Sequence, residues 1–244
     1  MEDWEFNVLG IYNYRKPGPF SHYFDHIIEN HRFIPGDICE AGVFRGSSLL
    51  AAAMLLRELN SDKIVWGYDT FSGFPHYHPN DDIEVFKGLR AGGRISDAHY
   101  QKVLLSQEYR GLSVEKVDVS TVSSSGNFSN TSLPLLQKKI TYLGLENIRL
   151  VQGTFAETMT PDEGHTFFAA LLDCDLYEGY QVALPFIWNN LSVGGYIHID
   201  EYYSLKFPGA RIATDEFFAN KREKPQQHRQ NPGDFERWFV RKLS

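Results

Sequence analysis

The 244-residue sequence contains two cysteines, and it has no apolar stretch that approaches the length of a membrane helix. Neither Cys39 nor Cys174 has a second cysteine nearby, so a redox or zinc motif of the Cys-x-x-Cys type has no support. We expect both to be buried free thiols in a reducing compartment. The N-terminus lacks the basic and apolar regions of a secretory signal. These absences predict a cytoplasmic protein that does not associate with membranes.

Positive charge is also scarce in this chain. The 24 lysines and arginines are outnumbered by 31 aspartates and glutamates, which gives a net charge of −7. Binding to the phosphate backbone of DNA or RNA depends on an excess of positive charge. We therefore expect no nucleic-acid partner.

Helical and strand-like segments alternate along the chain, and a hydrophobic content of 42% is enough for a full core. The patterns predict helices at residues 20–31, 49–59, 96–110, 135–143, 177–190 and 211–221, and strands at residues 37–41, 63–68, 148–152, 167–172, 195–199 and 237–243. This alternation is typical of a single doubly wound α/β domain over residues 1–244, with three layers and about seven mostly parallel strands.

Two segments between these elements are rich in turn-forming residues. Residues 71–96 are expected to form a long loop, and loops of this length are uncommon unless they cover a site. Residues 119–133 are the most linker-like stretch and predict either a mobile flap or a disordered turn. We therefore expect a variable insert or lid over about residues 76–133.

A turn containing two glycines connects the first predicted strand to the helix that follows. Gly42 and Gly46 are four residues apart, and the third glycine of the dinucleotide-binding pattern Gly-x-Gly-x-x-Gly is missing. Glu40 ends the strand with a carboxylate, which suits an ammonium group better than a pyrophosphate. The start of the helix at Ser47 can receive a carboxylate. The turn therefore predicts a binding site for an amino-acid moiety.

An acidic residue follows the second predicted strand. Asp69 lies 23 residues after Gly46, where a carboxylate can accept hydrogen bonds from both hydroxyls of a ribose. Gln152 and Gly153 follow the third strand and are placed to contact an adenine edge. A nucleoside joined to an amino acid indicates S-adenosylmethionine rather than NAD as the cofactor.

Four carboxylates follow two further apolar strands. Asp173 and Asp175 come after one strand, and Asp200 and Glu201 come after the next, 27 residues later. If the two strands are parallel neighbours, these side chains meet at one edge of the sheet, and a cation or a proton must neutralise their charge. Helix capping would explain one of the acids but not four. The sequence predicts an oxygen-ligated Mg²⁺, Ca²⁺ or Mn²⁺ that holds a substrate hydroxyl, with Asp173 or Asp175 as the catalytic base.

Together these motifs resemble the macrocin O-methyltransferase (TylF) family over about residues 35–220. The resemblance rests on the runs Glu40-x-Gly42-Val43-x-x-Gly46, Asp69-Thr70-Phe71-Ser72-Gly73-Phe74-Pro75, Gly153-x-Phe155, Asp173-x-Asp175-Leu176-Tyr177 and Ile199-Asp200-Glu201-Tyr202. It implies a Rossmann-like class I methyltransferase sheet and magnesium-dependent O-methylation, typically of a sugar hydroxyl on a natural product.

The resemblance also assigns roles to individual residues of this chain. It implies metal ligation by Asp173, Asp200 and Glu201, a base at Asp173 or Asp175, and cofactor contacts at Glu40, Gly42, Ser47 and Asp69. Ser72, in the run that follows Asp69, is a further candidate for contact with the cofactor. One departure from the family pattern is Glu201, because the family commonly has a second aspartate at this position, and the longer side chain changes the geometry of that ligand.

Three alternatives to this function remain open from the sequence. The acceptor is a hydroxylated small molecule, but it is either a sugar or a catechol-type diol. An NAD-dependent oxidoreductase on a similar sheet is disfavoured by the missing glycine. A non-catalytic module that binds the cofactor without turnover is the remaining alternative. The sequence leaves open whether the protein forms a homo-oligomer.

Overall fold

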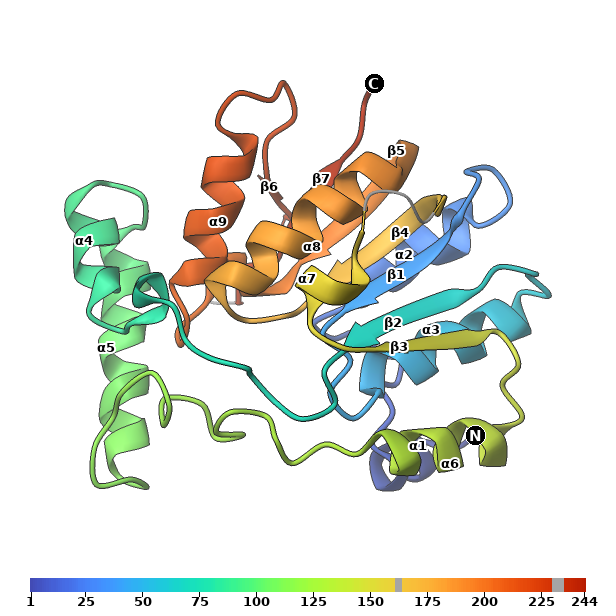
Figure 1. Ribbon diagram of the computed structural model, residues 1–244, viewed down its shortest axis with the longest axis horizontal. Coiled ribbons are helices and arrows are strands. Elements are labelled where there is room, and N and C mark those ends of the chain that lie inside the picture. The colour runs from blue at the N-terminus through green and yellow to red at the C-terminus, as the bar shows by residue number, and fades with distance from the viewer. Residues whose placement is uncertain (161–163, 230–234) are drawn as a thin grey trace.

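The chain folds around a seven-stranded sheet in the computed structural model, which describes residues 1–160, 164–229 and 235–244 (Figure 1). The strand order is β3-β2-β1-β4-β5-β7-β6, and β7 alone runs antiparallel to its neighbours. The strands are β1 (Asp37–Ala41), β2 (Val65–Asp69), β3 (Ile148–Gln152), β4 (Phe167–Leu172), β5 (Leu191–Ile199), β6 (Gln226–Gln227) and β7 (Trp238–Arg241). The predicted doubly wound, mostly parallel sheet is confirmed.

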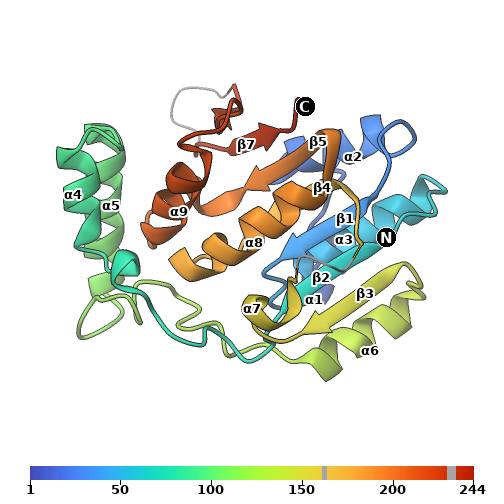
Figure 2. The same ribbon diagram turned by 45° about the horizontal axis from the view of Figure 1, so that its top comes forward.

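Helices cover both faces of this sheet, as Figures 1 and 2 show. One face packs against α1 (Asp3–Leu9), α2 (Ser21–Asn30), α3 (Ser47–Glu58) and α6 (Leu133–Leu143). The other packs against α7 (Phe155–Thr158), α8 (Tyr177–Asn190) and α9 (Gly209–Phe218). Every residue of β4 is buried because the strand is central and covered on both faces. Among the residues that the structure describes, no helix has both the length and the apolar character needed to cross a bilayer.

The segment between β2 and β3 differs from the sequence prediction. Residues 71–96 are not one long loop, because they contain a 3₁₀ turn, η1 (Pro79–Asp81), and a helix, α4 (Val85–Ala91). Phe86 and Leu89 lie on one side of α4 and are buried, and this short apolar pair is obscured in the sequence by the glycines and charges around it. α4 packs against α5 (Asp97–Gly111), and the pair stands beside α9, beyond the carboxyl ends of the parallel strands (Figure 2).

The register of the three central strands places the predicted site residues at one level of the sheet. Ala41 of β1 pairs with Leu172 of β4, and Leu172 pairs in turn with Ile199 of β5. The residues that follow these three are therefore brought together at the carboxyl edge of the sheet. They are Gly42, Asp173 and Asp200.

Candidate active site

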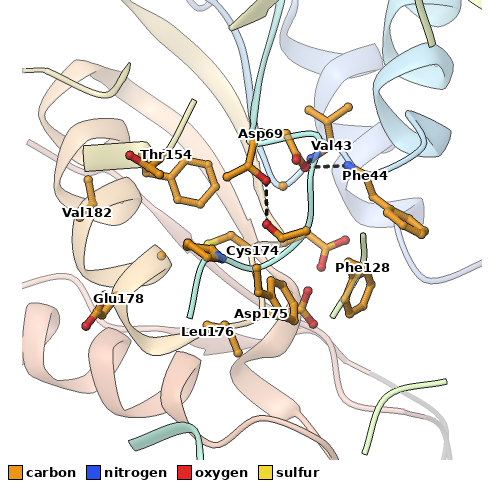
Figure 3. A pocket seen from close by; sticks show the side chains of 18 of the residues that line it. Val43, Phe44, Asp69, Phe128, Thr154, Cys174, Asp175, Leu176, Glu178 and Val182 are labelled. Atoms are coloured by element: carbon orange, nitrogen blue, oxygen red, sulfur yellow. Dashed lines mark hydrogen bonds between the residues drawn. The ribbon is translucent and has the colours of Figure 1, made fainter. Parts of the chain in front are cut away.

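A cavity of about 430 Å³ lies at this carboxyl edge. Its wall combines the turn after β1, the loops after β2 and β3, and the segment from Asp173 into α8. In Figure 3, Thr154 and Val182 lie on one side of the cavity, and Phe44 and Phe128 lie on the other. Five of the residues predicted for the site line this one cavity: Gly42, Ser47, Asp69, Asp173 and Asp175.

Gly42 occupies a position that no other residue could fill without rearrangement. Its φ of 91° lies in the left-handed region, and a Cβ atom added there would be 1.9 Å from the carbonyl oxygen of Asp173. The turn after β1 therefore passes directly over the backbone after β4. This close approach brings the predicted cofactor half and the predicted acceptor half of the site into contact.

Asp69 connects the turn after β1 to the loop after β2. Its Oδ2 accepts hydrogen bonds from the backbone N–H groups of Val43 and Phe44, both at 2.8 Å (Figure 3), and its Oδ1 accepts one from Phe71 at 2.6 Å. Phe44 and Phe71 both have positive φ angles, 51° and 52°, which are costly for a side chain of this size. A carboxylate has about four acceptor positions, so one remains for a ligand. The predicted ribose contact of Asp69 stays a prediction.

Glu40 lies beneath the cavity and is fully buried. Its Oε1 accepts a hydrogen bond of 2.8 Å from the Ser48 hydroxyl, which lines the cavity. Its Oε2 has no hydrogen-bond partner among the described residues. Burial raises the pKa of Glu40 to about 8. A buried carboxylate oxygen without a donor fits the ammonium of an amino-acid moiety, which is the group predicted at this end of the strand.

Besides Glu40, three further predicted cofactor residues lie outside the lining of the cavity: Ser72, Gln152 and Gly153. Ser72 and Gln152 are exposed, and Gln152 donates a long hydrogen bond of 3.4 Å to the Thr70 carbonyl. Gly153 directly follows β3, and the residues after it, Thr154 to Ala156, line the cavity in its place. The roles of Ser72, Gln152 and Gly153 therefore stay predictions.

Asp173, Asp200 and Glu201 form a compact acidic cluster. One ligand oxygen from each lies within 4.8 Å of the other two. Glu201 is held in place by its backbone N–H, which donates to the Tyr180 hydroxyl at 3.2 Å, and that hydroxyl donates to the Leu172 carbonyl. Asp200 Oδ1 is buried and has no hydrogen-bond partner among the described residues. His198 Nε2 and Arg237 Nη1 lie 3.5 and 3.6 Å from this oxygen. A set of carboxylates with a buried oxygen that accepts no hydrogen bond fits a hard divalent cation.

Asp175 lies beside this cluster and not within it. It is 6% exposed, and its φ of 59° is unusual for a residue other than glycine. Burial and the charge of Glu201 raise the pKa of Asp175 well above its usual range. Burial and the charges of Asp200, Asp175 and Glu201 do the same for Asp173.

Basic side chains that were not predicted surround the acids. Lys206 Nζ lies 3.3 Å from Glu201 Oε1 and 3.9 Å from Asp175 Oδ1, and Arg237 Nη1 lies 3.6 Å from Asp200 Oδ1. The carboxylates, Glu201 above all, raise the pKa of Lys206. Burial raises the pKa of Asp200, but His198 together with the charges of Arg237 and Lys206 outweighs it, so the net pKa of Asp200 lies below its usual value.

The predicted flap or disordered turn at residues 119–133 forms part of the cavity wall. The backbone N–H of Phe74 donates to the Asn127 carbonyl at 2.9 Å, and Arg45 Nε donates to the Asn130 carbonyl at 2.9 Å. Phe128 packs against Phe44 and Phe74, with ring centroids 5.1 and 4.9 Å away. The segment is therefore anchored to both loops that Asp69 connects.

One further polar pair lines the cavity. His76 Nε2 contacts Glu178 Oε2, which joins the loop after β2 to the first turn of α8. The sequence places His76 in the predicted long loop and Glu178 in a predicted helix, but no spacing rule relates the two residues.

Comparisons with known proteins agree with this geometry. The family model for Macrocin-O-methyltransferase (TylF) matches residues 19–102 and 116–228. The chain is 28% identical over 218 residues to demethyldecarbamoylnovobiocin O-methyltransferase of Streptomyces niveus, covering 89% of this chain and 70% of that protein. It is 27% identical over 190 residues to mycinamicin III 3''-O-methyltransferase of Micromonospora griseorubida, covering 75% of this chain and 61% of that protein.

A third relative and two solved structures extend the comparison. The 8-demethyl-8-(2,3-dimethoxy-alpha-L-rhamnosyl)-tetracenomycin-C 4'-O-methyltransferase of Streptomyces olivaceus is 28% identical over 174 residues, which cover 69% of this chain and 54% of that protein. The structure of the O-methyltransferase NovP superposes with a TM-score of 0.64 at 20% identity, over 98% of this chain and 80% of that one. The calicheamicin methyltransferase CalS11 superposes with a TM-score of 0.61 at 19% identity, over 98% and 78% of the two chains.

The two structures share the fold of the chain, and the family model covers most of its length. The predicted resemblance, the class I methyltransferase sheet and the enzyme class are thereby confirmed. The chain belongs to the macrocin O-methyltransferase (TylF) family of S-adenosylmethionine-dependent O-methyltransferases.

Proposed function

We propose that this protein transfers the methyl group of S-adenosylmethionine to a sugar hydroxyl of a glycosylated small molecule, with a divalent cation at the acidic cluster. The observation that supports this most directly is the shared cavity. Its lining includes Ser47 and Asp69 from the predicted cofactor half, together with Asp173 and Asp175 from the predicted acceptor half. A methyl donor and a hydroxyl acceptor must meet in one enclosed space for in-line transfer.

The residues on the cofactor side suit a zwitterion joined to a nucleoside. Glu40 Oε2 offers a buried acceptor for the ammonium group, and the N-terminus of α3 at Ser47 and Ser48 offers backbone donors for the carboxylate. Asp69 retains one acceptor position for a ribose hydroxyl. Apolar residues of the wall, including Phe155 and Val182, suit the adenine ring.

The residues on the acceptor side suit a hydroxyl that must lose its proton. Asp173, Asp200 and Glu201 would hold the cation, preferably Mg²⁺, which when bound lowers the pKa of a coordinated hydroxyl. Asp175 lies in the cavity wall but outside this set of ligands, so it is the better placed of the two candidate bases. Its raised pKa makes it a better proton acceptor than an exposed carboxylate.

The class of acceptor is inferred from the relatives. The name of one of them includes a rhamnosyl group and a 4' position, and the name of another specifies the 3'' position of mycinamicin III. A catechol-type diol remains the second candidate, because two adjacent hydroxyls suit a cation equally well.

Calorimetry and a transfer assay test the proposal separately. We expect S-adenosylhomocysteine to bind the wild-type protein, and Asp69→Asn to bind it at least tenfold more weakly, while the exposed control Asp62→Asn binds it like wild type. Labelled methyl groups should then appear on rhamnosides or related glycosides and not on catechols. No binding of S-adenosylhomocysteine would refute the cofactor, and transfer to catechols alone would refute the sugar acceptor.

A further inference from the structure

The acidic cluster and the basic side chains beside it carry a net negative charge that can be counted. Asp173, Asp175, Asp200 and Glu201 supply four carboxylates within one small region. Two permanent cations reach them, Lys206 at 3.3 Å from Glu201 and Arg237 at 3.6 Å from Asp200. Four ionised carboxylates and these two cations together carry a net charge of minus two. One divalent cation brings that charge to zero.

Lys206 is held in position by its own segment of chain. The Ser204 hydroxyl accepts hydrogen bonds from the backbone N–H groups of Lys206 and Phe207, at 3.1 and 2.9 Å. Phe207 is fully buried and packs with Val122 and Leu176 in one apolar cluster. The lysine side chain is 34% exposed, so it reaches the acids from the solvent side. Its ammonium is therefore a preorganised countercharge and not a freely moving surface group.

Lys206 also divides the four acids into two groups. Its Nζ contacts Glu201 and lies 3.9 Å from Asp175, which is the acid that stands outside the compact cluster. Asp173 and Asp200 are free of contact with it. Lys206 therefore occupies one oxygen of Glu201 and leaves Asp173 and Asp200 without a contact from this lysine, while Arg237 lies 3.6 Å from Asp200 Oδ1.

We propose that Lys206 sets the affinity and valence preference of the acidic cluster, by lowering its charge to the value that a single divalent cation neutralises. The proposal rests on the cation site of the proposed function and adds a residue that acts on it from outside the ligand set. At a separation of about 5 Å, Coulomb repulsion between an ammonium and a divalent ion lowers the affinity for that ion more than about tenfold, even at the dielectric constant of water.

Titrations of the full-length protein with Mg²⁺, in the presence of S-adenosylhomocysteine, test this proposal. We expect Lys206→Met to bind Mg²⁺ at least tenfold more tightly than wild type and to show a larger gain still for Tb³⁺, followed by its luminescence. Lys206→Arg keeps the charge and should remain within threefold of wild type. Lys16→Met removes a lysine that is paired with Asp3, away from the site, and should change nothing.

A double variant tests whether the charge of Lys206, and not another effect of its removal, changes the Mg²⁺ affinity. Lys206→Met combined with Asp175→Asn removes one charge of each sign, so the net charge and the Mg²⁺ affinity should return to within threefold of wild type. Equal or weaker Mg²⁺ binding by Lys206→Met would overturn the proposal, as would a double variant that binds at least tenfold more tightly than wild type. If wild type itself binds neither ion yet still binds S-adenosylhomocysteine, both this proposal and the cation site are refuted, while the cofactor site stands.

Discussion

The buried carboxylate of Glu40, whose Oε2 has no hydrogen-bond partner among the described residues, gives the sharpest prediction about this protein. Burial raises its pKa to about 8 from an ordinary value of about 4.5. Between these two pH values the folded protein without cofactor binds more protons than the unfolded chain. The free energy of unfolding therefore falls as pH rises through this window. The full effect for one completely buried group is on the order of 4 kcal/mol.

Glu40→Gln removes the titration while preserving the shape of the side chain. We expect the variant and wild type to have similar free energies of unfolding near pH 5, and the variant to be more stable at pH 8 by a few kcal/mol, on the order given by the pKa shift. S-adenosylhomocysteine should narrow this difference, because it binds wild type more tightly than the variant. Losing a charged hydrogen bond to its ammonium costs about 1.5–3 kcal/mol, or roughly 10- to 100-fold in affinity.

Urea denaturation at half-unit steps from pH 5 to 8, with and without S-adenosylhomocysteine, measures both effects. Glu146→Gln, at an exposed position, is the matched control and should follow the wild-type curve. Parallel pH profiles for Glu40→Gln and wild type would refute the buried, unpaired state of Glu40. Unchanged affinity for S-adenosylhomocysteine at pH 8 would refute the pairing of Glu40 with the ammonium group.

Three further substitutions test other parts of the site. Gly42→Ala should destabilise the fold by at least about 3 kcal/mol, because the added Cβ would overlap the Asp173 carbonyl. In the control Gly88→Ala, in α4, the added Cβ meets no atom within 4 Å, so this variant should be as stable as wild type or more stable. Equal melting temperatures for the two variants would contradict the close approach at Gly42. Phe128→Ala should weaken binding of S-adenosylhomocysteine about tenfold by opening the cavity wall, and calorimetry showing wild-type affinity would contradict that role. Asp200→Asn should abolish Mg²⁺ binding but leave S-adenosylhomocysteine binding within threefold, and retained Mg²⁺ affinity would remove it from the ligand set.

The sheet could be predicted from the sequence because each parallel strand is a short apolar run that ends in a polar or glycine residue. The bounds of β3, β4 and α8 match the predicted ranges. α1, α4 and α7 were missed, since four to seven residues carry too little periodicity to separate from a loop. β5 begins at Leu191, four residues before the predicted start, because Ser192 to Gly194 lack a continuous apolar pattern. The Gly194 N–H donates to the Lys242 carbonyl, a backbone contact that the sequence pattern does not reveal.

The acids of the site were predictable for a reason that does not extend to the cations around them. Asp173 and Asp200 directly follow β4 and β5, so strand register alone brings them to one level. Lys206 reaches the same point from a bend after the 3₁₀ turn η2 (Asp200–Tyr203), and Arg237 precedes β7, the antiparallel strand. Their positions depend on tertiary packing, of Phe207 in one case and of β7 against β5 in the other. A sequence pattern can therefore locate the charges that a cation must balance, but the charges that limit its affinity become visible only in the folded chain.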